Sequence, residues 1–409
     1  MPRSLFAVLY RTAFAIAAFT AMFVSGAHAS SEKVLYAFTG GNDGQLPYSN
    51  LIFDGSGNLY GTTNYGGANS KGTAFVLSPN GHGGWTETVI HTFGAGTDGY
   101  QPECGLLLDS SGNLYGTTYQ GGKFGHGTVF ELSPSGKNWK EKILHSFKGP
   151  EGADPIAGLI LDSLGNLYGT ASEGGSHEYG AVFMLTPGSN GQWKEKAIHS
   201  FNNNGHDGYA PLGALLLDSL GNLYGTTSQG GSQRNGIVFE LVPGTNGKWT
   251  EKTIHTFNPA NGHDGSAPND ALIMDASGNL YGTTYSGGKS KFYGTVFELS
   301  PATNGKWTET ILHGFSGAND GSEPTAGVIM DGNGNLYGST VVGGTAGVVY
   351  ELSLVNGKWK ETVLHEFKGG SDGDRAYGTL VFDTNGVLYG TTGHGGGNAD
   401  AGTVFQVTP

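Results

Sequence analysis

One phrase recurs seven times along this chain of 409 residues. Its second copy, residues 106–118, reads LLLDSSGNLYGTT, and its aspartate returns at positions 54, 109, 162, 218, 275, 331 and 383. Successive aspartates are 52 to 57 residues apart, so the seven copies fill almost the whole chain after residue 30. A nearly constant period of this length is typical of an array of similar units that bury a continuous core. Residues 30–409 are therefore predicted to form a single repeat domain.

Each unit is predicted to contain four short β-strands. In the second copy these are an apolar run at 106–108 and the segments 114–118, 128–132 and 139–147. The segments are rich in β-branched and aromatic residues and are bounded by turn residues, whereas helical periodicity is absent. Glycine is abundant, with 74 residues, but aromatic residues make up 11% of the chain, too many for a disordered protein. The fold class is therefore all-β, and four-stranded units repeated around a ring make a β-propeller.

The two ends of the repeat region predict how the ring closes. Residues 33–38, KVLYAF, match a fourth strand such as residues 142–147, KILHSF, whereas residues 403–407, TVFQV, match a third strand. Pairing of the N-terminal strand with the last, three-stranded unit would complete a seventh blade and remove two exposed strand edges. We therefore expect a seven-bladed propeller of four-stranded antiparallel blades.

The first 29 residues have the layout of a signal peptide. Arg3 and Arg11 lie near the start, an apolar stretch covers 12–24, and small residues precede Ser30. We expect cleavage near Ala29 and a secreted protein, periplasmic or extracellular, with an uncleaved anchor as the alternative. A membrane-spanning helix needs about 20 apolar residues, and the stretch at 12–24 has only 13. No transmembrane span is expected in the mature chain. Cys104 is the sole cysteine, so no internal disulfide can form.

The charge balance argues against nucleic acid as a partner. The chain has 21 basic and 34 acidic side chains, a formal net charge of -13. Binding to phosphates requires a basic stripe that such a composition does not favour. We expect a monomer.

Three short phrases carry a resemblance to a known family. They are GNLYGTT at 112–118, GTVFELSP at 127–134 and LHSF at 144–147. Through them the chain resembles the Gloeo/Verruco (GloVer) tandem repeat of choice-of-anchor bacterial surface and secreted proteins, over essentially the whole mature chain. The resemblance implies export, repetition and often surface attachment, and it implies no particular activity. A weaker similarity of residues 105–115 to NHL-type propeller repeats supports the same fold.

Three positions repeat around the predicted ring and are expected to be structural. The Asp-x-x-Gly-Asn turn suits a hairpin, because Asp bonds to its own turn and Gly takes positive φ. Calcium is the alternative there, although one carboxylate per turn is fewer than it normally takes. With period two, Glu87, Val89 and His91 share one face of a strand, so the His is expected to pack between blades. The equivalent histidines and tryptophans are His91, His145, His199, His255, His313, His365, Trp85, Trp139, Trp193, Trp249, Trp307 and Trp359.

The candidate ligand site lies on loops. In a four-strand meander, the loops before the first strand and those between the second and third strands share one face, and that face is where symmetry breaks. Residues beside a repeated Pro should ring the mouth of the central channel, and they form a mostly acidic rim. The candidate binding residues are Glu103, Asp154, Asp270, Glu323 and Arg375 on this rim, and Tyr119 and Tyr285 in the second-to-third loops. Aromatic faces with carboxylates and amides suit sugar rings.

The leading hypothesis is a secreted or cell-surface module that binds carbohydrate or another cell-envelope ligand. The alternative is an extracellular hydrolase or lyase that uses the acidic channel mouth. It requires carboxylates with shifted pKa values clustered in one pocket. A third reading is a purely structural surface protein. No catalytic residue and no cofactor is predicted, and calcium is the one metal left open.

Overall fold

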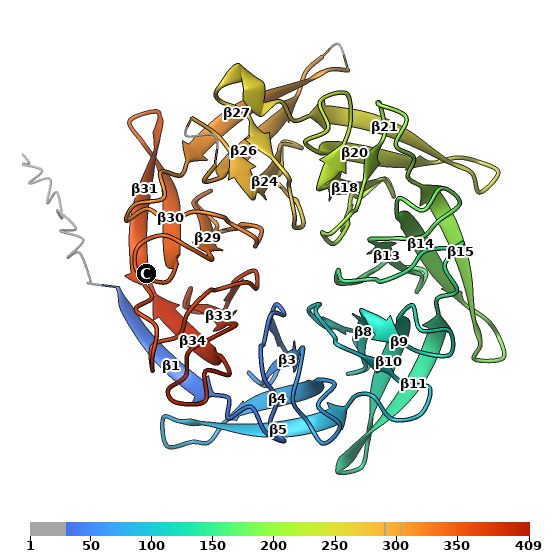
Figure 1. Ribbon diagram of the computed structural model, residues 1–409, viewed down its shortest axis with the longest axis vertical. Helices are drawn as coiled ribbons and strands as arrows, with labels where there is room; N and C mark the ends of the chain where they lie inside the picture. Colours follow the sequence, from blue (N-terminus) through green and yellow to red (C-terminus); the bar gives the residue numbers. More distant parts are fainter. Residues whose placement is uncertain (1–29, 290–291, 304) are drawn as a thin grey trace, which may run out of the picture.

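Seven small antiparallel sheets stand around a central axis as the blades of a propeller (Figure 1). The computed structural model describes residues 30–289, 292–303 and 305–409, so the predicted signal peptide lies outside the described residues. In these ranges the strands are joined by loops and one short 3-10 helix, η1 (Pro259–Asn261). No helix of the described chain is long and apolar enough to cross a membrane. The prediction of an all-β, seven-bladed propeller is confirmed.

The blades share one plan, with strands running from the axis outward. The innermost strands have two residues each: β2 (Ile52–Phe53), β7 (Leu107–Leu108), β12 (Ile160–Leu161), β17 (Leu216–Leu217), β23 (Ile273–Met274), β28 (Ile329–Met330) and β32 (Val381–Phe382). The second strands are fully buried: β3 (Leu59–Thr63), β8 (Leu114–Thr118), β13 (Leu167–Ala171), β18 (Leu223–Thr227), β24 (Leu280–Thr284), β29 (Leu336–Thr340) and β33 (Leu388–Thr392). The third strands are β4 (Thr73–Pro79), β10 (Thr128–Ser135), β14 (Ala181–Pro187), β20 (Ile237–Pro243), β26 (Thr295–Pro301), β30 (Val348–Val355) and β34 (Thr403–Thr408). The outermost strands are β5 (Trp85–Thr92), β11 (Asn138–Ser146), β15 (Trp193–Ser200), β21 (Trp249–Thr256), β27 (Trp307–Gly314), β31 (Lys358–Glu366) and β1 (Ser31–Ala37).

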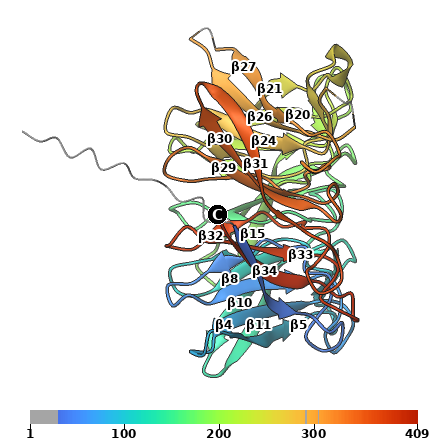
Figure 2. The same ribbon diagram turned by 90° about the vertical axis from the view of Figure 1, so that its left-hand side faces the viewer.

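We number the blades 1 to 7 from β2 to β32 and call the contact between neighbouring blades a seam. Blade 7 is assembled from both ends of the chain: β1 pairs with β34, from Ser31 opposite Thr408 to Ala37 opposite Thr403. The two strands lie side by side, blue against red, in Figures 1 and 2. The predicted closure is confirmed, and it leaves β34 with partners on both sides.

The hydrophobic core lies in the seams. At seam 1–2, Phe93 of blade 1 packs on Phe130 of blade 2 with ring centroids 5.0 Å apart, and both rings are fully buried. A side chain at Gly116 has no room there, because its Cβ would lie 2.6 Å from Cζ of Phe130. The glycine of the repeated LYGTT phrase therefore admits the aromatic ring of the next strand.

The two threonine hydroxyls of the same phrase make different hydrogen bonds, one to the next blade and one within its own blade. Thr117 Oγ1 donates a hydrogen bond of 3.1 Å to the backbone oxygen of Ala157 in the next blade. Thr118 Oγ1 pairs with Thr128 Oγ1 at 2.9 Å within its own blade. The hydroxyls that repeat the link to the next blade belong to Thr62, Thr170, Thr226, Thr283, Ser339 and Thr391. Hydrogen bonds thus run from blade to blade around the whole ring.

A β-bulge in each outer strand changes which residues share a face. In β5, Ala74 lies opposite His91 and Phe75 opposite Val89, so Ile90 is an extra residue. Trp85 therefore packs towards Tyr389 of the preceding blade, with centroids 6.2 Å apart, whereas His91 points to Glu141 of the following blade. The expectation that Glu87, Val89 and His91 share a face is wrong, because strict alternation ends at the bulge. The expectation that His91 packs between blades is confirmed.

The repeated aspartate closes its own turn. Asp109 Oδ1 accepts hydrogen bonds from the backbone N–H groups of Ser111 and Asn113, both at 2.8 Å. Its Oδ2 accepts from Asn113 Nδ2 at 2.9 Å and from the Tyr115 hydroxyl at 3.1 Å. Burial would raise the pKa of Asp109, but these hydrogen bonds outweigh it and hold the pKa below its ordinary value. Both oxygens are engaged by the protein, as expected for a structural turn.

We predict that this turn makes the protein sensitive to acid. A depressed carboxyl pKa stabilises the folded state above the unfolded value of about 4, and that stability is lost as the pH falls through the folded pKa. Asp109→Asn should lower the urea midpoint at pH 7 and reduce its further decrease between pH 5 and pH 3. Chemical denaturation at these pH values, with Asp218→Asn at the equivalent turn as a comparison, measures both effects. An unchanged pH dependence in Asp109→Asn would contradict the prediction.

Candidate functional site

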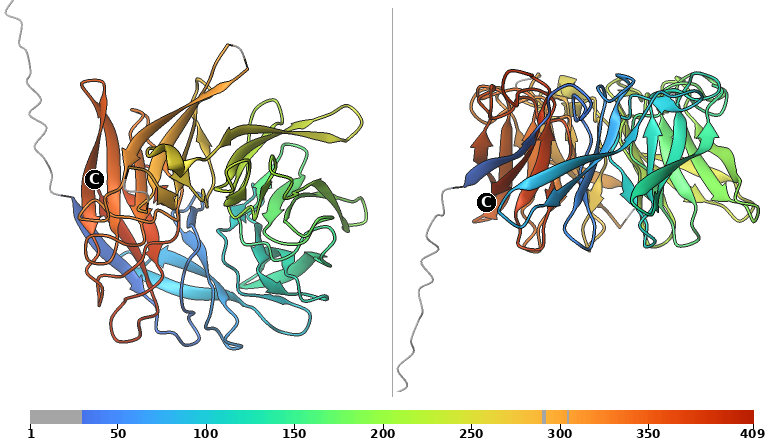
Figure 3. Two further views of the ribbon diagram at one scale, coloured as in Figure 1. Left: turned by 45° about the horizontal axis from the view of Figure 1, so that its top comes forward. Right: turned by 90° about the horizontal axis from the view of Figure 1, so that it is seen from below.

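Two sets of loops meet at one end of the ring, which we call the loop face. They pair in every blade: Gln45 bridges Tyr65 in blade 1, and β16 (Gly208–Tyr209) pairs with β19 (Gln229–Gly230) in blade 4. Two more such pairs are β6 (Gly99–Tyr100) with β9 (Gln120–Gly121), and β22 (Gly265–Ser266) with β25 (Ser286–Gly287). The loop face is at the top of the right-hand view in Figure 3. The two loop sets therefore share one face, as the strand order predicts.

The residue before the repeated Pro adopts a left-handed backbone, which is unusual for a side chain other than Gly. For Asp154 φ is 56°, and its N–H donates to the backbone oxygen of His126 in the preceding blade. The other residues at this position have φ between 54° and 59°: Leu46, Gln101, Ala210, Ala267, Glu323 and Arg375. Each loop is thus hydrogen-bonded to the blade before it, so the backbone of the loop face is held in one conformation.

A small cavity of about 130 Å³ lies on the axis, lined from all seven blades. The residues that follow the repeated Pro, or Ala376 in blade 7, all border it: Tyr48, Glu103, Ile156, Leu212, Asn269, Thr325 and Tyr377. Of the predicted rim residues, Glu103 and Asp270 line this cavity. Tyr48 and Tyr377 meet at the seam of blades 7 and 1 with ring centroids 4.6 Å apart.

Asp270 holds three blades together. Its carboxylate accepts hydrogen bonds from the N–H of Ala271 at 2.7 Å, the N–H of Gly327 at 2.6 Å and the hydroxyl of Thr379 at 2.5 Å. Burial raises the pKa of Asp270 in spite of these bonds. The side chain therefore ties blades 5, 6 and 7 at the axis, and its oxygens are already satisfied by the protein.

The other predicted residues have separate partners. Glu103 accepts a hydrogen bond from Asn64 Nδ2 at 2.8 Å, and burial raises its pKa. Glu323 accepts from the Tyr285 hydroxyl at 2.8 Å, while Arg375 faces Asp374 with Nε 3.7 Å from Oδ1.

Asp154 and Tyr119 lie near each other on the loop face. Burial and the nearby charge of Glu173 raise the pKa of Asp154. The pKa of Tyr119 is raised by burial and then by Asp154. The seven predicted residues thus come from five blades, and Glu103 and Asp270 are the two that line the axial cavity.

The structure adds a pocket on the loop face that the sequence did not reveal. It has a volume of about 420 Å³, lies at seam 3–4, and has Tyr179 and Tyr209 among its lining residues. The two rings have centroids 5.4 Å apart and planes tilted by 57°. The remaining lining is mostly polar: Ser172, Glu173, Glu178, Ala210, Leu212 and Gln229. Tyr209 and Glu178 come from loops of neighbouring blades, so no local pattern places them together.

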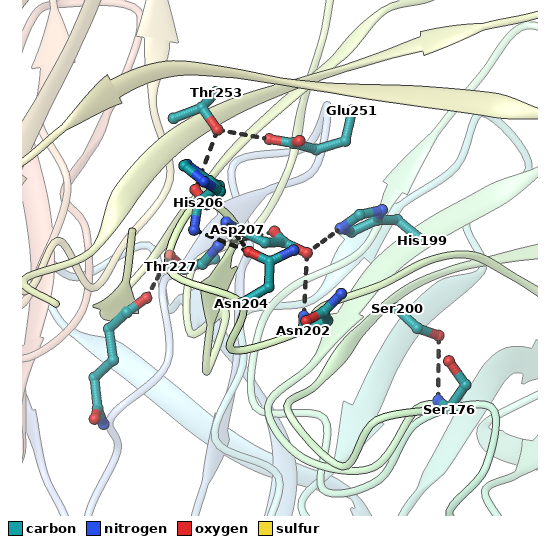
Figure 4. A network of polar contacts seen from close by, with 12 residues as sticks. Ser176, His199, Ser200, Asn202, Asn204, His206, Asp207, Thr227, Glu251 and Thr253 are labelled. Atoms are coloured by element: carbon teal, nitrogen blue, oxygen red, sulfur yellow. Dashed lines mark hydrogen bonds and ion pairs between the residues drawn. The ribbon is translucent and has the colours of Figure 1, made fainter. Parts of the chain in front are cut away.

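A second set of residues lies at the outer part of six of the seven seams. A His from one outer strand, an acidic residue from the loop after it, and a Glu from the next outer strand come together. At seam 3–4, His199 Nε2 lies 3.3 Å from Asp207 Oδ2, which also accepts from the Asn202 N–H at 3.1 Å (Figure 4). Glu251 completes this group and accepts from the Thr253 hydroxyl at 3.2 Å. We call these sets the seam groups.

The seam groups account for the repeated histidines. The sequence did not predict that the His, the acidic residue and the Glu of each group lie together. In six copies the sequence has a His and, several residues later, an Asp or Glu followed by Gly, but the Glu that completes the group belongs to the outer strand of the next blade. At seam 1–2 the Glu is Glu141; burial and the nearby Asp98 raise its pKa to about 9. At seam 4–5, burial and Asp264 raise the pKa of Glu309 to about 9. A Glu that recurs about 50 positions after five of the six histidines is the signal that could have shown them; the partner of His365 is Glu32, from the strand that closes the ring.

Comparisons with known proteins place these features in context. The family model described as the Gloeobacter/Verrucomicrobia repeat matches residues 22–232 and 213–409. Among curated proteins, none matches the sequence significantly.

Solved structures are similar in fold. One is described as the extracellular domain of a one component system from B. thetaiotaomicron, with a TM-score of 0.56 and 13% identity over 91% of this chain and 39% of that one. This chain thus spans about two fifths of that protein. Another is described as a 6-phosphogluconolactonase from Bacteroides uniformis, with a TM-score of 0.51 and 13% identity over 79% of this chain and 85% of that one. At such identity the likeness concerns the fold alone.

Proposed function

The chain belongs to the Gloeobacter/Verrucomicrobia repeat family, and we propose that it is a secreted or cell-surface propeller that binds carbohydrate on its loop face. The observation that carries this proposal is the pocket at seam 3–4, where two tyrosines stand beside two carboxylates and an amide. Its volume of about 420 Å³ is within the usual range for small-ligand pockets, which is about 300–1,000 Å³.

The chemistry of the lining suits a sugar. Tyr179 and Tyr209 offer aromatic surface to the C–H face of a pyranose ring. Glu173, Glu178 and Gln229 offer acceptors and donors to hydroxyl groups around that ring. The fixed backbone of the loop face reduces the ordering that binding requires. A neutral or cationic oligosaccharide of a cell envelope fits this lining better than an anionic one, because the pocket holds two carboxylates and no basic side chain among the residues described around it.

Export supports an envelope ligand. Residues 1–29 have the layout of a signal peptide, and the similar fold from B. thetaiotaomicron is described as an extracellular domain.

Replacement of Tyr209 by Ala is expected to weaken glycan binding about tenfold or more, because loss of the ring removes stacking area. Glycan-array screening of the full chain followed by calorimetry with the best soluble sugar measures this. Tyr100→Ala is the matched control, since Tyr100 occupies the equivalent position in β6 outside the pocket. Tyr119→Ala and Tyr285→Ala test whether the ligand extends to the tyrosines predicted from the sequence. Equal loss in Tyr100→Ala and Tyr209→Ala, or no glycan bound at all, would contradict the proposal.

A further inference from the structure

Four of the seam groups bring three potential metal ligands together. In each, one nitrogen or oxygen atom from every residue lies within 4.8 Å of the other two. The two most enclosed groups are His91, Asp98 and Glu141 at seam 1–2, and His255, Asp264 and Glu309 at seam 4–5. They are distinct from the residues of the loop-face pocket.

The spacing within these two groups suits ligands of a common ion. His255 Nε2 lies 3.4 Å from Asp264 Oδ2 and 3.5 Å from Glu309 Oε1. The corresponding distances from His91 Nε2 are 3.1 Å to Asp98 Oδ2 and 3.6 Å to Glu141 Oε1. Three of these four distances exceed the usual N–H···O range of about 2.7–3.2 Å. Ligands about 2.0–2.2 Å from a tetrahedral ion lie about 3.3–3.6 Å from one another.

Buried polar atoms in these groups lack protein partners. The side chains of Asp264 and Asp98 are 3% and 5% exposed, and their Oδ1 atoms accept no hydrogen bond from any residue that the structure describes. Within the same described ranges, His255 Nε2, Glu309 Oε1 and Glu141 Oε1 also lack hydrogen bonds. A buried carboxylate without a partner is costly, and a bound cation removes that cost.

The electrostatics point the same way. In each of the two groups, two carboxyl groups lie beside one imidazole. A divalent cation at the centre would balance both carboxylates when they are ionised. The imidazoles are about one fifth exposed, which leaves a route for an ion from the outer surface of the ring.

We propose that these two seam groups bind divalent transition-metal ions, with Zn²⁺ as the best match. The imidazole ligand disfavours calcium, which takes oxygen ligands, and His with carboxylates is a common donor set for zinc. Three protein ligands leave a fourth position for water. Each ion would fasten the outer strand of one blade to the outer strand of the next, so metal binding would stabilise the ring.

One seam provides a natural comparison. At seam 7–1 the histidine position is Tyr36, whose hydroxyl donates to Asp43 Oδ2 at 3.0 Å. Glu87 occupies the place of Glu141 there, and burial, followed by the charge of Asp43, raises its pKa. This group has the carboxylates and lacks the imidazole, so it is not expected to bind zinc tightly.

The test is metal binding by the full chain after removal of metal with a chelator. Titration with Zn²⁺, followed by dialysis and elemental analysis, is expected to retain at least two equivalents and to raise the melting temperature. Co²⁺ used as a spectroscopic probe should give the d–d bands of a four-coordinate site. The double variant Glu141→Gln, Glu309→Gln should lose two equivalents and most of the Co²⁺ spectrum, whereas Glu87→Gln should lose none.

Circular dichroism of each variant shows whether it is folded. Zinc retained in full by the folded double variant would place the metal on surface histidines and overturn the proposal. Retention of less than one equivalent by the parent chain would also overturn it, and would favour a proton shared between the paired carboxyl groups. Neither result bears on glycan binding, which uses other residues.

Discussion

Deletion of residues 30–38 is expected to abolish the cooperative folding of the propeller. The deletion removes β1 and with it the partner of β34 along six paired positions. It also removes Phe38, which is 1% exposed and packs on Phe75 with centroids 5.2 Å apart. Loss of one such aromatic side chain costs about 3–5 kcal/mol, and a typical domain is stable by only about 5–15 kcal/mol. Blade 7 would also present an unpaired strand edge to solvent.

Thermal unfolding followed by near-UV circular dichroism measures this effect, with a chain that begins at Ser30 as the control. A synthetic peptide of residues 30–40, added to the shortened chain, is expected to restore part of the transition by supplying the missing strand. A shortened chain that melts at the temperature of the control would show that closure contributes little to stability.

The second large effect is expected for Phe239→Ala, which should lower the free energy of unfolding by about 3–5 kcal/mol. Phe239 is fully buried at seam 3–4, where it packs on Phe201 with ring centroids 5.3 Å apart. Its ring also fills the space that Gly225 leaves open, since a Cβ there would lie 2.6 Å from Cζ of Phe239. The neighbouring strands are hydrogen-bonded to further blades, so they cannot move in fully to fill the cavity that removal of the Phe239 ring leaves.

Urea denaturation at 25 °C gives the change in free energy. Phe292→Ala is the control, because Phe292 is 70% exposed and its removal should change stability by less than about 0.5 kcal/mol. Since Phe239 is not among the residues that line the pocket at seam 3–4, glycan affinity of the folded variant should remain within a few fold of the parent. A loss of stability as small as that of the control would contradict the importance of the seam core.

The architecture was predictable because it depends on short-range patterns that repeat. The period of the LYGTT phrase indicates the number of blades, and the identity of the strands at the two ends indicates how the ring closes. The pairing of the two loop sets on one face follows from the strand order. The GloVer resemblance agrees with the family to which the chain belongs.

The site was less predictable, because its residues come from different blades. Asp270 aligns with small residues in other copies, yet it points across the axis to Gly327 and Thr379. The rim residues beside the repeated Pro were placed on the loop face, but their partners depend on which blade stands next to them. The pocket between Tyr179 and Tyr209 exists only where two particular loops meet.

The repeat, the strands, the turn chemistry and the closure can be predicted from the amino-acid sequence, since each depends on neighbours a few residues apart or on the periodic copy of one unit. The contacts within the seams depend on how the blades pack in three dimensions. Each outer strand contains one extra residue at its β-bulge. In β5 this residue places His91 on the opposite face from Glu87, so that His91 points to Glu141 of the next blade. Strict alternation along the strand would not predict this change of face. The curvature of the ring then sets how closely the next blade approaches, and this approach brings residues about 50 positions apart within ligand distance of one another.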